Sequence, residues 1–243
     1  MQNLFKNSKN SKKIESKIRK ALYEFEMLKD INSLAIALSG GKDSLTLLYM
    51  LSKIIGNGFD NIKLIAIHID GSFSCGANVS KKYLSDICKS LNVEFVTQTL
   101  DIPYDKLNCY SCSRDRRRLI FDISKKNDCS TIAFGHHRDD NIQTLLLNLF
   151  HKAEFASMMP KIKFKKISST IIRPLIFVEE QEIITFAKVN NFLKTTCQCP
   201  FGNSTNRKKI DKIINQIEFD FPNIRNNLSL SSFTYGSKKA LDI

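Results

Sequence analysis

The sequence lacks an apolar run long enough to cross a membrane and an apolar core near its start. A membrane-spanning helix needs roughly 18 to 20 consecutive apolar residues, and the 243-residue chain contains no such stretch. Its opening segment, MQNLFKNSKNSKKIESK, carries lysines and serines where a secretory signal has an apolar segment. These absences argue against an integral membrane protein, and we expect a cytoplasmic protein of one large or two small domains.

The sequence also lacks the even set of cysteines that is typical of a secreted disulfide framework. It has seven, an odd number, and a reducing compartment disfavours disulfides. The isolated Cys75, Cys88 and Cys129 are expected to be ordinary buried or half-buried thiols. Metal binding or catalysis better explains the clustered ones, which are Cys109, Cys112, Cys197 and Cys199.

Acidic residues are too few to balance the basic ones. The chain has 37 Lys and Arg against 24 Asp and Glu, a formal net charge of +13. A basic surface can be merely solvated, and a composition rich in Lys, Asn and Ile produces one without a function. The charge is nevertheless gathered in the blocks 6–20, 114–118, 161–166 and 207–209. This clustering favours a nucleic acid partner, because Lys and Arg that neutralise phosphates release bound counterions.

Short apolar segments alternate with amphipathic ones along most of the chain. Continuous apolar or β-branched runs predict strands at 33–38, 63–70, 93–100, 130–135 and 169–175. Helical periodicity predicts helices at 14–28, 44–55, 77–91, 114–126, 140–150 and 179–191. Such alternation predicts right-handed βαβ units and a doubly wound, mostly parallel α/β sheet. Beyond Lys194 the alternation stops, and a short helical C-terminal extension is expected.

The motif SGGKDS, at residues 39–44, lies between the first predicted strand and its helix. Glycines let the backbone approach a ligand, and the helix N-terminus behind them presents N–H groups and a positive dipole end. Lys42 adds a charge, Asp43 can hold Mg2+, and Ser39 and Ser44 can donate hydroxyls. A simple Gly-Gly turn with a capping serine is the alternative. The motif is neither the GxxxxGKS/T nucleotide loop nor the GxGxxG dinucleotide fingerprint, and its flanking elements favour a phosphate cradle.

A second motif, GHHRDDNIQT at residues 135–144, also follows a predicted strand and opens a helix. Both motifs therefore lie at the carboxyl edge of one parallel sheet, where open α/β sheets bind ligands. His136 or His137 beside Asp139 and Asp140 could bind a metal or relay protons. Zinc would require further matched ligands, and a capped helix start is the alternative.

The two cysteine pairs form the third constellation, CxxC at 109–112 and CxC at 197–199. Four cysteines could bind zinc, although the CxC spacing departs from the usual pattern. Three cysteines around an iron–sulfur cube would leave one iron open to a substrate such as sulfide. A redox CxxC would act alone and would leave the second pair unexplained.

The motifs SGGKDS, CYSCSR, GHHRDDNIQT and CQCPFGNSTNR follow one another in this order between about residues 21 and 228. In this order the chain resembles the tRNA 2-thiocytidine synthetase group of PP-loop ATP pyrophosphatases. The resemblance implies an ATP pyrophosphatase fold, a 4Fe-4S cluster held by three cysteines, and binding of ATP and Mg2+. It also implies a tRNA substrate, a cytidine as the base that receives sulfur, sulfide or a cysteine desulfurase persulfide as the sulfur donor, and a possible homodimer.

The resemblance assigns roles to individual residues. Its cluster ligands fall on Cys109, Cys112 and Cys199, with Cys197 one position from the expected place. Its catalytic residues fall on Asp43, Asp139 and Arg116, and Gln143 stands where the group often has Glu. Its ATP site falls on Ser39, Gly40, Gly41, Lys42, Asp43, Ser44, Gly135 and His136.

The arginine block beside the CxxC pair is expected to lie on a helix. There Arg114, Arg117 and Arg118 would share one face, while Leu119, Ile120 and Ile123 would pack inward. That arginine face would either contact the tRNA backbone or simply be solvated. Arg116, four residues after Cys112, matches a position that is basic in thiolating relatives and is expected inside the site.

The resemblance divides the chain into a basic N-terminal helical segment (1–30), a PP-loop domain (31–194) and a C-terminal segment with the third cluster ligand (195–243). Alternative functions are a PP-loop enzyme that thiolates uridine or removes sulfur, and a zinc-stabilised nucleic-acid-binding module. The 2-thiouridine enzymes carry additional CxxC pairs at their ends, which this sequence lacks. Lysidine synthetases share the loop but lack the cysteines, so they fit less well.

Overall fold

The computed structural model describes residues 8–71, 80–101, 109–164, 167–192 and 206–234. Its centre is a six-stranded sheet in the order β3-β2-β1-β4-β6-β5, parallel except for β5, which pairs antiparallel with β6. The doubly wound, mostly parallel fold is therefore confirmed. The strands are β1 (Ser33–Ala37), β2 (Lys63–Asp70), β3 (Glu94–Thr99), β4 (Thr131–Ala133), β5 (Lys161–Phe164) and β6 (Ser169–Ile172).

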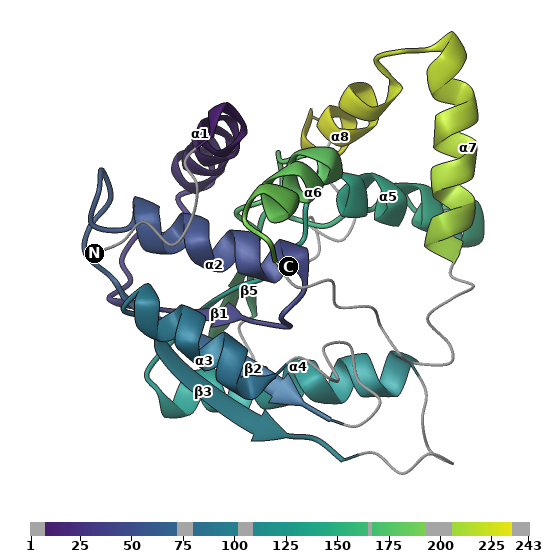
Figure 1. The fold of residues 1–243 in the computed structure, drawn as a ribbon. Helices are drawn as coiled ribbons and strands as arrows, with labels where there is room; N and C mark the ends of the chain where they lie inside the picture. Colours follow the sequence, from purple (N-terminus) through teal and green to yellow (C-terminus); the bar gives the residue numbers. More distant parts are fainter. Residues whose placement is uncertain (1–7, 72–79, 102–108, 165–166, 193–205, 235–243) are drawn as a thin grey trace.

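Helices cover both faces of this sheet (Figure 1). Along β1, Leu34 and Ile36 face one apolar core while Ala35 and Ala37 face the other, since successive strand side chains point to opposite faces. Burial on both faces explains why the central strands are apolar throughout. The first core packs against α1 (Lys9–Glu24), α2 (Lys42–Ile54), α3 (Lys81–Ser90) and α6 (Glu180–Val189); the second packs against α4 (Cys109–Lys126).

Three elements differ most clearly from the sequence-based expectation. Helix α1 spans Lys9–Glu24 in place of the predicted 14–28, and Ser8 caps its start. Helix α4 begins at Cys109, five residues before the predicted start, because no Gly or Pro interrupts CYSCSRDRRR. Strand β5 was not predicted, since its four residues KIKF are too few to show a clear period. Its lysines are typical of an edge strand, where charge discourages pairing with another chain.

The C-terminal extension is a pair of helices where the sequence predicted one. Helix α7 (Asn206–Asp220) and helix α8 (Ile224–Thr234) both pack against α5 (Arg138–Lys152), as Figure 1 shows. Ile210 and Ile214 of α7 are buried against Ile142 and Leu146 of α5. Within the described chain, no helix combines the length and the apolar character that crossing a membrane requires.

Candidate functional site

The loop between β1 and α2 is stabilised by its own serines. The Oγ atoms of Ser39 and Ser44 lie 3.1 Å apart, and the Gly41 amide donates to Ser39 Oγ at 3.3 Å. Gly40 has a φ of 82°, a conformation that favours glycine. Gly41 is the N-cap of α2 and has no side chain to cap it. The start of α2 therefore suits an anionic ligand such as a phosphate, because amides and dipole point toward it.

Lys42 lies between two carboxylates. Its Nζ is 3.0 Å from Asp43 Oδ1 and 3.0 Å from Glu180 Oε1 at the start of α6. Burial opposes the charge on Lys42, but attraction to Asp43 and the hydrogen bond to Glu180 leave its pKa raised above the ordinary value. Lys42 is thus a permanently charged group at the loop. The sequence analysis did not identify Glu180, whose only signal was an acidic pair at the start of a helix.

Gly135, at the carboxyl end of β4, packs directly on this loop. A Cβ atom at position 135 would lie 3.2 Å from the backbone carbon of Asp43 and 3.2 Å from the Ser44 nitrogen. The two motifs therefore approach as closely as backbone allows, and only glycine fits without movement. The expectation that both motifs meet at one edge of the sheet is confirmed.

His136 stacks on Phe134 with ring centroids 5.7 Å apart. Burial, together with the positive charge of Arg173, lowers the pKa of His136 to about 4. Its imidazole is consequently neutral at physiological pH. A neutral ring beside an apolar ring fits a surface that contacts a nucleobase or ribose better than one that binds phosphate.

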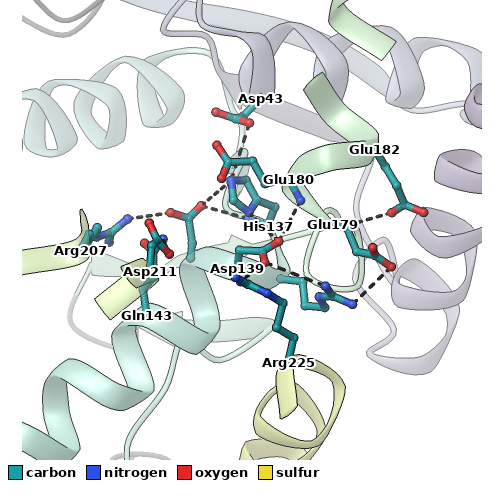
Figure 2. A network of polar contacts seen from close by, with 12 residues as sticks. Asp43, His137, Asp139, Gln143, Glu179, Glu180, Glu182, Arg207, Asp211 and Arg225 are labelled. Atoms are coloured by element: carbon teal, nitrogen blue, oxygen red, sulfur yellow. Dashed lines mark hydrogen bonds and ion pairs between the residues drawn. The ribbon is translucent and has the colours of Figure 1, made fainter. Parts of the chain in front are cut away.

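His137 is buried among the acids of both motifs (Figure 2). Its Nε2 lies 3.8 Å from Asp43 Oδ1 and 3.4 Å from Asp140 Oδ2, while its Nδ1 lies 3.9 Å from Asp139 Oδ2. This histidine therefore connects the first motif to the second. The arrangement is suited to transmitting a change at Asp43 to the start of α5.

The two aspartates of the second motif are held by several donors. Asp139 accepts a hydrogen bond from the Glu180 amide at 2.8 Å and another from Arg225 Nη1 at 3.1 Å. Asp140 accepts from the His137 amide at 3.2 Å and pairs with Arg207 at 2.6 Å. Burial opposes ionisation of Asp140, but His137, His136 and Arg207 lower its pKa. Asp140 is thus held as a carboxylate.

The expected basic residue near the cysteines reaches the same edge of the sheet. Arg116 is half-buried, and its Nη2 donates to the Ile69 carbonyl near the end of β2 at 2.8 Å. Arg114, Arg117 and Arg118 are exposed, as predicted. The inward packing is also confirmed: Ile120 and Ile123 are buried in the second core, with Leu119 against it.

The cysteine set is only partly visible. Cys109 and Cys112 occupy the first turn of α4, three positions apart, and Cys112 is half-buried. The Cys109 side chain, Cys197 and Cys199 lie outside the described residues, so the three-ligand set stays a prediction. Among the side chains that are described, no three metal-binding groups converge. The thiol of Cys112, one turn before Arg116, fits an iron–sulfur ligand, because thiolates are the donors such clusters take.

Gln143 contacts the C-terminal extension. Its Nε2 donates to Asp211 Oδ1 of α7 at 2.8 Å. The carboxylate of this pair belongs to Asp211 of α7. Neither Asp211 nor Arg225 was predicted from the sequence, because each lies far along the chain from its partner. Arg207 was noted within a basic block and at the end of the CQCPFGNSTNR motif.

Comparisons with known proteins agree with this geometry. A family model described as a PP-loop domain matches residues 10–196. The chain is 32% identical over 225 residues to the tRNA-cytidine(32) 2-sulfurtransferase of Geobacter sulfurreducens, covering 89% of this chain and 87% of that protein. It is 34% identical over 228 residues to tRNA-cytidine(32) 2-sulfurtransferase 2 of Francisella tularensis subsp. novicida, covering 91% and 90%.

Two solved structures share the fold. The U34-tRNA thiolase NcsA from Methanococcus maripaludis, solved with its 4Fe-4S cluster, has a TM-score of 0.74 at 24% identity and covers 91% of this chain and 78% of that one. NMN synthetase from Francisella tularensis has a TM-score of 0.53 at 13% identity and covers 85% and 82%. At these identities the likeness establishes the architecture alone.

Proposed function

We propose that this chain replaces the 2-oxygen of a tRNA cytidine with sulfur at the expense of ATP. The chain belongs to the PP-loop family and, within it, to the tRNA-cytidine(32) 2-sulfurtransferases. The observation that carries the proposal is the meeting of the two motifs: His137 lies 3.8 Å from Asp43, and Gly135 packs on the loop. Together they form one site with an anion-binding helix start and a carboxylate for a metal.

The first step is adenylation of the base. The 2-oxygen of the base attacks the α-phosphorus, the bond to the β-phosphate breaks, and pyrophosphate leaves. Asp43 would hold Mg2+, which would supply positive charge to stabilise the pyrophosphate leaving group. Lys42 exchanges a carboxylate partner for a phosphate oxygen. The remaining ATP contacts come from Ser39, Gly40, Gly41, Ser44, Gly135 and His136.

The second step exchanges AMP for sulfur. Cys109, Cys112 and Cys199 would hold a 4Fe-4S cluster, which would supply a binding place for the sulfur that is transferred. Arg116 stabilises the negative charge of the adenylate, which increases as AMP leaves. Asp139 is proposed to take up a proton, and to do so it would release one of its two hydrogen bonds. AMP carries away the original 2-oxygen.

The proposal includes the partners and the division of the chain. The exposed Arg114, Arg117 and Arg118 bind the tRNA backbone. Sulfide or a cysteine desulfurase persulfide is the sulfur donor, and the enzyme acts in the cytoplasm, as a possible homodimer. The PP-loop domain spans 31–194, flanked by a basic helical segment (1–30) and the C-terminal segment (195–243).

Nucleoside analysis of tRNA from a deletion strain tests the proposal. We expect 2-thiocytidine to be lost and to return with the wild-type gene. Loss of 2-thiouridine alone would point to a uridine enzyme, and a gain of thiolated nucleosides would point to one that removes sulfur. Unchanged nucleosides would contradict the proposal.

Metal analysis of anaerobically purified protein tests the cofactor. We expect iron, sulfide and brown absorbance at about 400 nm, whereas stoichiometric zinc without iron would favour a zinc-stabilised nucleic-acid-binding module. Cys112→Ser and Cys199→Ser should lose iron, while Cys197→Ser should lose less. Greater iron loss in Cys197→Ser than in Cys199→Ser would show that Cys197 is the third ligand.

A further inference from the structure

The helical pair α7–α8 contacts α5 in two different ways. An apolar contact joins Ile210 and Ile214 to α5, and these two side chains are 3% and 1% exposed. Polar contacts join the first two turns of α5 to the same pair of helices (Figure 2). Apolar contact is not directional, so several registers of α7 on α5 would bury similar area. The polar contacts select one of them.

Two of these polar contacts form a ladder between α5 and α7. Asp140 pairs with Arg207 at 2.6 Å, and Gln143 pairs with Asp211 at 2.8 Å. The partners are three residues apart on α5 and four apart on α7, so each helix contributes neighbouring positions of one face. A shift of α7 by one residue would break both contacts, and Gln143 and Asp140 are largely buried. Losing either contact would leave a buried polar group unsatisfied.

Arg225 of α8 makes the third contact. Its guanidinium reaches Asp139 at 3.1 Å, Glu218 at 2.9 Å and Asn215 at 2.5 Å. It therefore fastens α7 and α8 to each other and to α5. The other oxygen of Asp139 accepts a hydrogen bond from the Glu180 amide at the start of α6. Asp139 thus connects the α7–α8 pair to α6, where Glu180 forms an ion pair with Lys42.

These contacts end at the ATP loop. Arg207 fixes one oxygen of Asp140, and the other oxygen lies 3.4 Å from His137 Nε2. The same Nε2 lies 3.8 Å from Asp43. Asp140 therefore lies between Arg207 of α7 and the side chain that faces the proposed Mg2+ ligand.

We propose that Arg207, Asp211 and Arg225 are positioning residues, which dock the α7–α8 pair in one register and thereby hold the second motif against the ATP loop. The inference rests on the proposed ATP site and deepens it, because it makes the C-terminal helices a working part of that site. It predicts that Mg·ATP binding depends on a contact such as Gln143–Asp211, whose atoms do not touch the nucleotide.

Gln143 and Asp211 allow a reciprocal test. Gln143→Glu sets two carboxylates against each other with almost no change in shape. Adding Asp211→Asn exchanges amide and carboxylate between the two helices and restores the hydrogen bond. Gln216→Glu, the same change at an exposed position of α7, is the matched control. On full-length protein purified anaerobically, we would measure the dissociation constant for Mg·ATP, kcat and KM for tRNA-dependent pyrophosphate release, and the folded fraction.

We expect Gln143→Glu to weaken Mg·ATP binding about tenfold, the size of a lost hydrogen bond to a charged group, with the protein still folded at assay temperature. The double variant should recover most of this loss, and Gln216→Glu should behave as wild type. If the contact were purely stabilising, Gln143→Glu would lower the folded fraction and leave the ATP affinity per folded molecule unchanged. Either that result or a loss of ATP affinity that the double variant does not restore overturns the inference. Wild-type protein that binds ATP but makes no 2-thiocytidine would overturn the proposed function alone, since docking is read on ATP binding.

Discussion

Two strand–loop–helix junctions lie side by side at the carboxyl edge of the sheet, and their helices differ in how the N-terminus is capped. At β1–α2 the N-cap is Gly41, which offers no side-chain cap. At β4–α5 the N-cap is His137, whose amide donates to Asp140. The first helix start is thus left for an external anion, whereas the second is occupied by the protein's own acids.

The charged side chains beside the two junctions also differ in how exposed they are and in how firmly their partners hold them. Lys42 and Asp43 are each 32% exposed and bind each other, so an incoming ligand can replace these contacts. The Asp140 side chain is only 17% exposed and is held by Arg207 and by the His137 amide. The comparison shows that one junction is built to exchange partners and its neighbour is built to keep them. Substitutions at each should therefore affect different measurements.

The largest expected effect comes from removing the exchangeable carboxylate. Asp43→Ala should lower tRNA-dependent pyrophosphate release and thiolation by about 10²-fold or more, because the metal's charge stabilisation is lost where the leaving group develops charge. Iron content and tRNA binding should persist, since tRNA binding depends on the basic blocks and weakens as salt rises. Asp60→Ala, which removes another exposed acid, is the control. Undiminished pyrophosphate release in Asp43→Ala would show that this loop is not the ATP site.

A smaller effect is expected where the two junctions touch. Gly135→Ala places a methyl group about 3.2 Å from the backbone of Asp43 and Ser44, so the loops must separate by a few tenths of an ångström. We expect Mg·ATP affinity to fall roughly tenfold, because misplacing binding groups costs affinity and rate. Isothermal titration calorimetry measures this directly. Wild-type affinity in a folded Gly135→Ala protein would mean that the second motif does not shape the nucleotide site.

Substitutions at the β4–α5 junction should lower the free energy of unfolding. Asp140→Asn keeps the shape but removes the charge that pairs with Arg207 and caps α5. We expect a loss of about 1–2 kcal/mol in the free energy of unfolding, measured by urea denaturation. If Asp43→Ala destabilised the protein as much as Asp140→Asn, the distinction between the two junctions would fail.

A further expected effect concerns the pH dependence of stability at the second junction. The folded pKa of His136 is about 4 against an ordinary 6.5, so the unfolded chain binds a proton more readily. Stability should therefore fall as pH drops from 6.5 toward 4, by on the order of 1–3 kcal/mol. The pKa of Asp140 is also lowered, so its contribution is lost only at still lower pH, below its ordinary value of 3.8.

Urea midpoints measured across this pH range provide the test. His136→Gln should flatten the decline between pH 6.5 and 4, whereas His151→Gln, at an exposed position near the end of α5, should not. An unchanged decline in His136→Gln would assign the pH dependence to another group.

The sequence by itself determined five strands of the sheet, the order of these strands along the chain and the edge at which the motifs meet. Apolar runs such as 63–70 and glycines such as Gly40 and Gly41 act locally: burial on both faces requires the first, and close approach to a ligand requires the second. For that reason the first and second motifs could be placed at one site before any coordinates were known. The start of α4 and strand β5 were missed, because helix propagation and a four-residue edge strand leave little local signal.

Only the tertiary structure decided which charged and polar side chains pair with one another. Arg225 and Asp139 are 86 residues apart in sequence, and Gln143 and Asp211 are 68 apart. Neither pair has a periodic or spacing signature, because each depends on the register in which α7 and α8 pack on α5. That register is chosen by apolar burial acting together with buried polar groups that tolerate no unpaired partner. Such a choice is a property of the packed chain as a whole and cannot be read from any one segment.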